Sequence, residues 1–229
     1  MDTLLAAARP SILFESPTLL AVDKPAGVII HGDGTGIGTL TDTVRAMLVA
    51  RGDAPASEAL QALQRLDRDT SGIVLFSLDK ATQPAYDRMI AEHNMTKRYL
   101  AVVEGRVPWR QHTFRDPIGR DRHDARRMRV SKTGKQAVTH VELLDVTTVR
   151  RRTYSLLSVH IETGRKHQIR VHLSHAGFPI VDDTLYGKAH PQGLMLHARE
   201  LAFTDPVTHG SVRILSPVPT RFQMMFPQR

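Results

Sequence analysis

Hydrophobic residues along this chain occur mainly in short runs bounded by polar residues, and in places they alternate with polar residues with a two-residue period. That period turns successive side chains to opposite faces of a strand, so it predicts half-buried β-strands. The clearest two, residues 138–149 and 154–161, are predicted to be antiparallel neighbours joined by a turn at Arg150-Arg151-Arg152. Further strands are predicted over residues 12–14, 19–22, 28–31, 73–76, 96–105, 179–183, 194–198, 201–203 and 212–215.

Three segments have instead the longer period of an amphipathic helix. Their predicted spans are 39–51, 79–93 and a stretch that opens at Thr163 and ends at a Gly177 cap. Residues 53–57 are predicted to be a linker. The apolar positions that support these helices are Leu40, Val44, Met47, Leu48, Tyr86, Met89, Ile90, Ile169, Val171, Leu173 and Ala176.

Many short antiparallel strands with a few helices indicate an α+β fold. The chain has 229 residues, which is long enough for a substantial core. We find no internal repeat, low-complexity stretch or clear interdomain linker in it. We therefore expect a lead-in segment over residues 1–11 and a single domain over residues 12–229.

The densest polar segment, residues 64–72, directly precedes the apolar run 73–76. A polar turn that enters a buried strand can hold a functional carboxylate rigidly. Asp67 lies between Arg65 and Arg68, and nearby positive charge favours the ionised form of an acid. An ionised carboxylate suits a nucleophile or a base better than a proton donor. These residues alone leave a surface turn with structural ion pairs as the alternative.

The charge of the chain favours a polyanionic partner. It has 31 Lys and Arg against 23 Asp and Glu, a net charge of +8, and a pI near 10.2; such a balance favours nucleic acid. The most basic part, residues 115–135, is predicted to be an extended loop or hairpin that contacts phosphate, with a solvated charged face as the alternative. Its basic residues are Arg115, Arg120, Arg122, Arg126, Arg127, Arg129, Lys132 and Lys135.

Several kinds of site are excluded or disfavoured. The absence of cysteine removes disulfides, thiolate metal sites and cysteine nucleophiles, and is compatible with a reducing cytoplasm. No uncharged run approaches the roughly 20 residues of a membrane span, and residues 1–10 do not resemble a secretion signal. The glycine-rich segment 32–38 lacks the spacing of a phosphate-binding loop. His172 and His175 are three apart, but no HExxH pattern accompanies them, so no metal is expected.

Six motifs, in order along residues 12–215, together resemble the RluA-type RNA pseudouridine synthases. They are Asp23-Lys24-Pro25-Ala26-Gly27 with His31-Gly32, Arg65-Leu66-Asp67-x-x-Thr70-Ser71-Gly72, Lys97-Arg98-Tyr99-Leu100-Ala101, the run from Glu162 to His172, Asp182-Asp183-x-x-Tyr186-Gly187, and Leu196-His197-Ala198.

The resemblance implies a pseudouridine synthase-like, mixed and mostly antiparallel sheet with flanking helices and a central catalytic cleft. It implies isomerisation of uridine in RNA, with Asp67 as the essential aspartate and neither metal nor organic cofactor. Arg165 matches the arginine that pairs with the aspartate and keeps it ionised. Tyr99, which by itself would be taken for a core residue, matches the tyrosine that stacks on the uracil. Its hydroxyl is a candidate for removing the C5 proton.

We expect the target base to be flipped out, with Arg65 in the space that it leaves. The expected partner is ribosomal RNA, first of all 23S, or tRNA, with no membrane; a cytoplasmic monomer is expected. The residues predicted to contact RNA are Arg65, Arg68, Lys97, Arg120, Arg126, Arg127, Arg129, Lys166, His167 and Arg170.

The sequence departs from the family in two ways. Gln64 stands where the signature usually begins with His; we expect altered RNA contacts rather than lost activity, because Gln can hydrogen-bond but cannot titrate. We also expect a short form without the N-terminal S4 domain of many relatives.

The alternatives are a non-catalytic RNA-binding protein or chaperone of the same fold, and a glycosidase, for which Asp69 is the nearby second acid.

Overall fold

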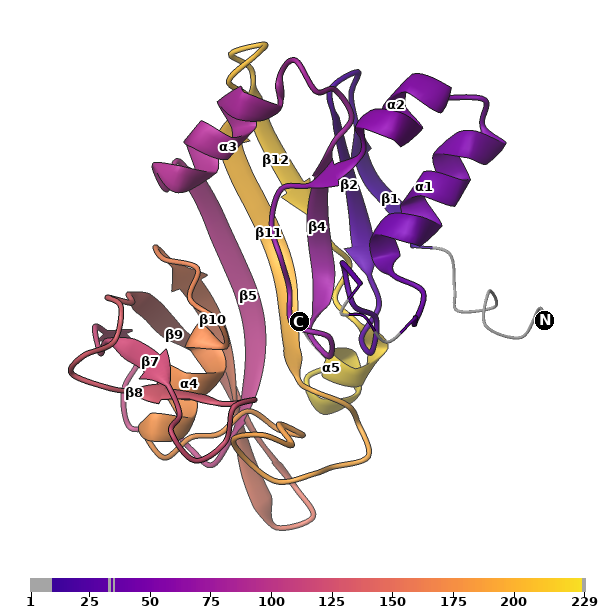
Figure 1. Cartoon of the computed structure of the whole chain (residues 1–229). Helices are drawn as coiled ribbons and strands as arrows, with labels where there is room; N and C mark the ends of the chain where they lie inside the picture. The colour runs from indigo at the N-terminus through magenta and orange to yellow at the C-terminus, as the bar shows by residue number, and fades with distance from the viewer. Residues whose placement is uncertain (1–9, 33, 35, 228–229) are drawn as a thin grey trace. The chain divides into compact units, whose positions relative to one another are not determined.

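The computed structural model describes residues 10–32, 34 and 36–227 (Figure 1). The fold is α+β with a mixed, mostly antiparallel sheet, as predicted. Its elements are β1 (Ile12–Glu15), β2 (Leu19–Lys24), α1 (Leu40–Ala50), α2 (Ala54–Ala59), β3 (Gln61–Ala62), β4 (Ser71–Ser77), α3 (Gln83–Ala91), β5 (Met95–Glu104), β6 (Gln111–Phe114), β7 (Ile118–Arg120), β8 (Met128–Val130), β9 (Thr139–Val149), β10 (Arg152–Ile161), α4 (Gln168–His175), β11 (Leu196–Thr204), β12 (Ser211–Leu215) and α5 (Thr220–Met225).

The chain forms two compact units. Unit 1 contains residues up to 95 and residues 200–216, and unit 2 contains residues 96–199 and 217 onward. The boundary falls within β11, whose first residues belong to unit 2 and whose later residues belong to unit 1. The expectation of a single catalytic domain over residues 12–229 stays a prediction. Within the described part of the chain, no helix is long and apolar enough to cross a membrane.

Strand β4 is the centre of unit 1. It pairs antiparallel with β2 and with β3, and β2 in turn pairs with β1. Every residue of β4 is buried. Ile73 and Leu75 contribute to one hydrophobic cluster, with Tyr86 and Met89 of α3. Val74 and Phe76 contribute to a second cluster, formed with α1 and α2. Because alternate side chains enter opposite faces, a strand covered on both sides needs apolar side chains on both, as the central run 73–76 has; the serines lie only at the two ends of the strand.

Unit 2 is built on four antiparallel strands in the order β5-β10-β9-β6. Tyr99 of β5, Val159 of β10 and Val141 of β9 are direct cross-strand neighbours, so they lie on one face of this sheet. Strands β7 and β8 form a separate antiparallel hairpin. A small cluster of Ile118, Ala137 and Val171 packs this hairpin against α4.

Two predictions in unit 1 were wrong. Residues 53–57 were predicted to be a linker, but they enter α2, because the Asp53 carboxylate accepts from the Ala56 N–H and caps a helix with proline in its first turn. Residues 28–31 were predicted to be a strand but form none. The carbonyls of Ile29 and Ile30 accept hydrogen bonds from the first residues of α1 instead.

Three predictions in unit 2 were changed by the structure. The helix expected from Thr163 begins only at Gln168, because His167 adopts a left-handed backbone with φ 56°. The strand expected over 179–183 is reduced to a single bridge at Ile180, and Asp182 also has a positive φ, of 60°. The two strands expected over 194–203 are one strand, β11, which crosses into unit 1.

Candidate functional site

Asp67 lies in the loop between β3 and β4 of unit 1 and is half-buried. The loop alternates between anchored and exposed residues. Leu66 packs against a hydrophobic cluster of the unit, whereas Arg65 is exposed. The Thr70 N–H donates to the Asp67 carbonyl at 3.1 Å, which closes a turn immediately before the buried strand β4. The backbone around Asp67 is therefore fixed on both sides.

A completely buried lysine anchors this loop. The Lys24 Nζ donates to the carbonyls of Pro25 at 2.9 Å, Val28 at 2.7 Å and Arg68 at 2.8 Å. An ammonium group has three N–H donors, and each has a backbone acceptor here. The Gly27 N–H also donates to the Arg68 carbonyl at 2.9 Å. The turn after β2 thus holds the residue directly after Asp67.

Sequence reasoning quoted Lys24 only as part of a motif and missed this role. A signal was available: Lys24 is the last residue of the strand Leu19–Lys24, whose other positions are apolar except Asp23. A lysine that continues a buried strand needs internal acceptors, because burial of an ammonium group without partners is costly.

Two neighbours of Asp67 also have internal partners. Arg68 is exposed, but its Nε donates to the Gly27 carbonyl at 3.1 Å, so part of its guanidinium secures the loop. The Gln64 Nε2 donates to the Ile73 carbonyl at 3.2 Å. Gln64 therefore makes a backbone hydrogen bond, which its amide can do without titrating.

Tyr99 and Arg165 belong to unit 2. Tyr99 is buried in β5, and Lys97, two residues earlier, lies on the same face of the strand. Lys97 is half-buried, and this burial lowers the pKa of its ammonium group. Because Asp67 belongs to unit 1, the meeting of Asp67 with Tyr99 and Arg165 stays a prediction.

Gln168 organises the loop that carries Arg165. The Gln168 Oε1 accepts from the Thr163 hydroxyl at 2.7 Å and from the Arg165 N–H at 3.1 Å. Its Nε2 donates to the Val138 carbonyl and the Thr139 hydroxyl, both at 2.9 Å. The amide thus uses both ends to tie the loop to β9. The Arg165 Nε donates to the Gln136 carbonyl at 2.9 Å, which fixes the direction of the side chain.

His172 continues this network through helix α4. Its Nε2 lies 2.9 Å from the Asp116 carbonyl, which can only accept, so Nε2 carries the proton. Its Nδ1 then accepts from the Thr139 hydroxyl at 2.9 Å. Burial lowers the pKa of His172 and keeps the ring neutral at pH 7. Both ring nitrogens are therefore engaged, and no His, Cys, Asp or Glu cluster in the described residues could hold a metal.

Arg170 is not the RNA contact that its charge suggested. Its Nε and Nη2 donate to the two carboxylate oxygens of Asp183, each at 2.8 Å, and both residues are almost fully buried. Asp183 also accepts from the backbone N–H groups of Leu185 and Tyr186. The bidentate pair fastens α4 to the turn that follows it, so Arg170 has a structural role.

Replacing Arg170 with methionine should destabilise the protein by about 3 kcal/mol, because the Asp183 charge would stay buried without its partner. Urea denaturation followed by circular dichroism would measure the change in the free energy of unfolding. Arg122→Met is the matched control, since Arg122 is exposed in the same unit. Equal stability of the two variants would show that the buried pair makes no net contribution.

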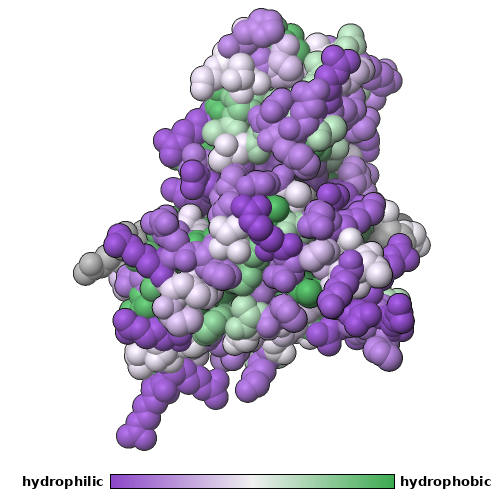
Figure 2. Space-filling view, turned by 90° about the vertical axis from the view of Figure 1, so that its left-hand side faces the viewer, coloured by the Kyte–Doolittle hydropathy of each residue, from purple (hydrophilic) through white to green (hydrophobic). Residues whose placement is uncertain are grey.

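The other predicted RNA contacts in unit 2 reach the surface. Arg120, Arg126, Arg129 and Lys166 are exposed, whereas Arg127 and His167 are half-buried. Arg126 forms a bidentate ion pair with Asp124, at 2.7 and 3.0 Å. This contact with the guanidinium and backbone of Arg126 lowers the pKa of Asp124 to about 2. Of the two predicted forms, extended loop or hairpin, the basic segment contains a hairpin, β7–β8, and all its basic side chains except that of Arg127 are exposed. In the face shown in Figure 2, hydrophilic residues predominate and hydrophobic ones form small separate areas.

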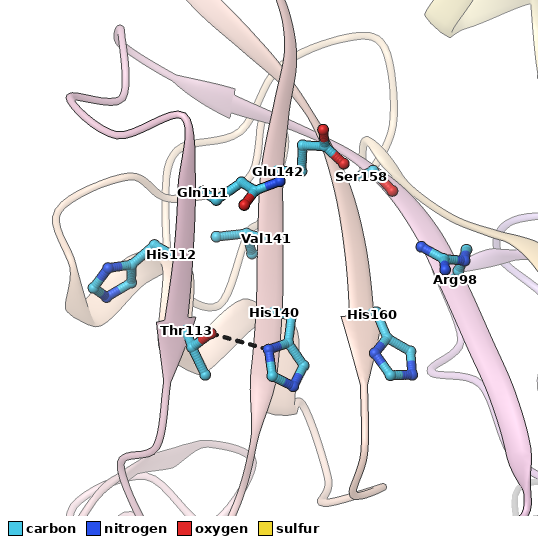
Figure 3. A pocket seen from close by; sticks show the side chains of 9 residues that line it. All are labelled: Arg98, Gln111, His112, Thr113, His140, Val141, Glu142, Ser158 and His160. Carbon is cyan, nitrogen blue, oxygen red and sulfur yellow. Dashed lines mark hydrogen bonds between the residues drawn. The ribbon is translucent and has the colours of Figure 1, made fainter.

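A polar groove of about 500 Å³ lies on the other face of the unit 2 sheet (Figure 3). Arg98, His160, His140 and Thr113 form one cross-strand row in it. The His140 Nε2 contacts Glu162 at 2.7 Å, and its Nδ1 contacts the Thr113 hydroxyl at 2.9 Å. Because Arg98 and Tyr99 are consecutive in β5, their side chains point to opposite faces. The side chains of this row thus point away from the face that carries Tyr99.

Comparison with known proteins identifies one family. Residues 18–175 match the model described as RNA pseudouridylate synthase. An uncharacterized RNA pseudouridine synthase, YhcT of Bacillus subtilis, is 34% identical over 211 residues, which cover 91% of this chain and 68% of that protein. Ribosomal large subunit pseudouridine synthase D of Xanthomonas campestris is 35% identical, in an alignment that covers 94% of this chain and 68% of that protein.

Solved structures give the same result. Human RNA pseudouridylate synthase domain containing 1 superposes with a TM-score of 0.78 at 28% identity, over 92% of this chain and 84% of that one. Human RNA pseudouridylate synthase domain containing 4 superposes with a TM-score of 0.75 at 22% identity, over 95% and 93%. The latter likeness concerns the fold alone.

Proposed function

The chain belongs to the RNA pseudouridylate synthase family, and from that premise we propose that it isomerises uridine in structured RNA through Asp67. The enzyme is an isomerase of RNA. The observation that carries the role of Asp67 is its anchoring: the adjacent Arg68 carbonyl accepts from both the buried Lys24 ammonium and the Gly27 N–H. A carboxylate on such a fixed backbone is suited to chemistry that requires it in one position.

The reaction breaks the N1–C1′ bond, turns the uracil, and forms a C5–C1′ bond; C5 loses its proton and N1 gains one. We propose that ionised Asp67 adds to the sugar or the base, or removes a proton from the sugar. Tyr99 would stack on the uracil, and its hydroxyl would remove the C5 proton. Arg165 would pair with Asp67 and favour its ionised form. No metal or organic cofactor is needed for these steps.

The remaining basic residues would hold the RNA. The basic hairpin (residues 115–135) offers its exposed arginines to phosphates, which favours binding to any structured RNA. Arg65 is exposed, two positions before Asp67, and would occupy the space that the flipped base leaves. Arg68, Lys97, Lys166 and His167 complete the proposed contacts, and Arg170 is removed from them because of its burial.

We propose large-subunit ribosomal RNA, 23S in bacteria, as the first substrate and tRNA as the second. The choice is supported by the relatives named ribosomal large subunit pseudouridine synthase D, of which those from Xanthomonas campestris and Xylella fastidiosa are 35% and 36% identical to this chain. A cytoplasmic location and a monomeric state stay predictions.

Tritium release from RNA labelled at uracil C5 tests this function. Transcripts of ribosomal RNA domains and a tRNA pool would be compared, with Asp67→Ala alongside. Release that is lost in the variant would support the isomerase and identify the RNA class. Absence of release from every RNA, with binding retained, would favour a non-catalytic RNA-binding protein of the same fold, and Gln64 would then be the first residue to restore to His.

A further inference from the structure

Tyr186 of unit 2 has a backbone that is fixed from two sides. Its N–H donates to the buried Asp183 carboxylate at 3.0 Å. Its carbonyl accepts from the Ser174 hydroxyl of α4 at 2.9 Å. The Gly187 N–H closes the turn by donating to the Asp183 carbonyl at 2.7 Å. Tyr186 is therefore a rigid projection from the turn that follows α4.

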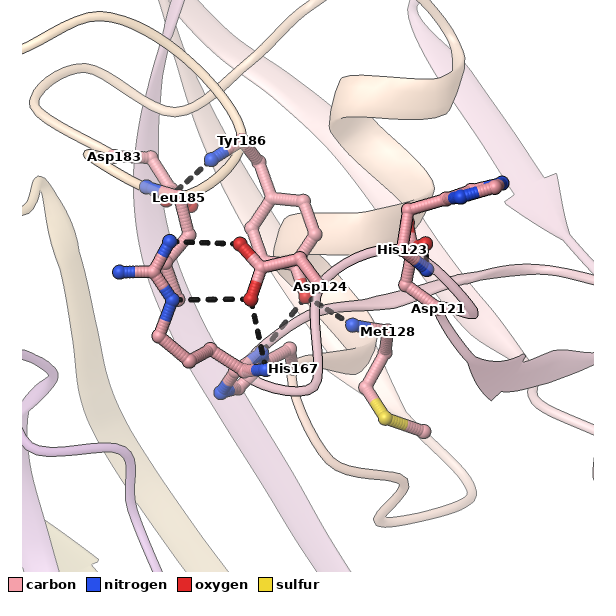
Figure 4. Close-up of polar contacts among 9 residues, drawn as sticks. Asp121, His123, Asp124, Met128, His167, Asp183, Leu185 and Tyr186 are labelled. Atoms are coloured by element: carbon pink, nitrogen blue, oxygen red, sulfur yellow. Dashed lines mark hydrogen bonds and ion pairs between the residues drawn. The ribbon is translucent and has the colours of Figure 1, made fainter.

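The hydroxyl of Tyr186 joins two segments that are distant in sequence (Figure 4). It accepts from the backbone N–H of Met128 at 2.7 Å, where β8 of the basic hairpin begins. It also lies 2.8 Å from the Nδ1 of His167, the residue directly before α4. Because a hydroxyl has two lone pairs and one proton, it can serve both contacts together.

The ring of Tyr186 supports the same junction. The guanidinium of Arg127, in the hairpin, lies 5.1 Å from the ring centroid, and that of Arg170, in α4, lies 5.2 Å from it. Both distances are within the range of cation–π attraction. The ring also packs against the small hydrophobic cluster that contains Ile118 and Val171. Hydrogen bonds and ring contacts therefore both connect the hairpin with α4.

The hairpin needs such a connection. Strands β7 and β8 have three residues each and form a two-stranded sheet. A short isolated hairpin is marginally stable in water, and this one also carries closely spaced like charges. Its arginines can contact phosphates at fixed positions only if its base is held against the rest of unit 2.

We propose that Tyr186 is a positioning residue for RNA binding: its hydroxyl couples the basic hairpin to the segment 163–168, which carries Arg165. This inference rests on the proposed function of the hairpin as an RNA contact. Tyr186 itself touches no reacting atom in this role. Tyr186 fixes the position of the basic hairpin. Through His167, it also connects the hairpin to the loop that Gln168 organises.

The test is Tyr186→Phe, which keeps the ring and removes only the hydroxyl. The KM for structured RNA should rise about tenfold while kcat stays within about twofold. The slope of log Kd against log salt concentration should become shallower by about one to two, because ordered phosphate contacts are lost. Amide hydrogen exchange at Met128 should become about tenfold faster without RNA. Tyr154→Phe, at another buried tyrosine of unit 2, should change none of these quantities.

A second variant, with Arg120, Arg122 and Arg129 all changed to Gln, distinguishes the RNA contact of the hairpin from its coupling through Tyr186. If this variant binds RNA with unchanged affinity and salt slope, the hairpin does not contact RNA and both proposals about it are overturned. If it loses affinity but Tyr186→Phe does not, only the coupling is overturned. Unchanged exchange at Met128 in Tyr186→Phe also overturns the coupling. A variant that combines Tyr186→Phe with the three Arg→Gln changes completes the test. If it loses no more RNA affinity than the triple variant, the coupling is supported, because the two sets of changes then remove the same contacts.

Discussion

Replacing Asp67 with asparagine is expected to lower the rate of uridine isomerisation by at least about 10³-fold. Asparagine has nearly the same shape, so the loop held by Lys24 and Thr70 should persist. The amide has no negative charge, and it can neither add to carbon nor accept a proton. Because the substitution affects the chemical step and not the RNA-binding surface, kcat should fall while the Kd for RNA changes by less than about threefold.

Single-turnover measurements with enzyme in excess would test this expectation, with tritium release as the readout and filter binding for the Kd. The matched control is Asp69→Asn, two positions away and exposed, which should retain activity within about twofold. Comparable losses in both variants would contradict a special role for Asp67, and would revive the alternative in which two acids act as a pair.

Lys24→Met is expected to destabilise the protein by about 5 kcal/mol, because three backbone carbonyls would each lose a hydrogen bond from the buried ammonium group that contributes roughly 1–3 kcal/mol. Methionine fills a similar volume but donates nothing. The Asp67 loop would lose its attachment at the Arg68 carbonyl. We therefore expect kcat/KM of the remaining folded enzyme to fall by about 10²-fold, as small displacements of a reacting group can cause.

Urea denaturation and initial rates at a temperature well below unfolding would separate the two effects. Lys80→Met, at an exposed position of the same unit, should leave both stability and rate close to wild type. A Lys24→Met variant that loses less than about 1 kcal/mol would show that water replaces the three hydrogen bonds, and that the buried ammonium does not hold the loop.

Elements whose pattern is local were predicted well from the sequence. The apolar run at the centre of β4 is buried as expected, because a strand covered on both faces has no polar position to interrupt it. The helical spacing over 39–51 became α1, with Thr39 and Asp42 forming a capping box. The alternation over β9 and β10 became an antiparallel pair. In each case, the residues that decide the element lie within it.

Elements that depend on distant partners were predicted less well. Residues 28–31 have the composition of a strand, but the Ile29 and Ile30 carbonyls accept from α1. Thr163 was expected to open a helix, yet its hydroxyl binds Gln168 and Val138, and the helix starts after a left-handed His167. A local pattern cannot indicate that a backbone group already has a partner elsewhere, because several conformations satisfy it equally well before the fold forms.

Local patterns in the chain were enough to predict the α+β class and the short antiparallel strands, and its motifs indicated the family, with Asp67, Tyr99 and Arg165 as candidates for the chemistry. The tertiary structure alone decided the roles of two basic residues. Arg170 and Lys24 have the same sign of charge as the surface arginines, but each is buried against an acceptor, at Asp183 and at the Arg68 carbonyl. Those acceptors lie 13 and 44 positions away. Burial depends on which distant groups the fold brings into contact, so the charge of a residue in the sequence does not indicate whether it is buried.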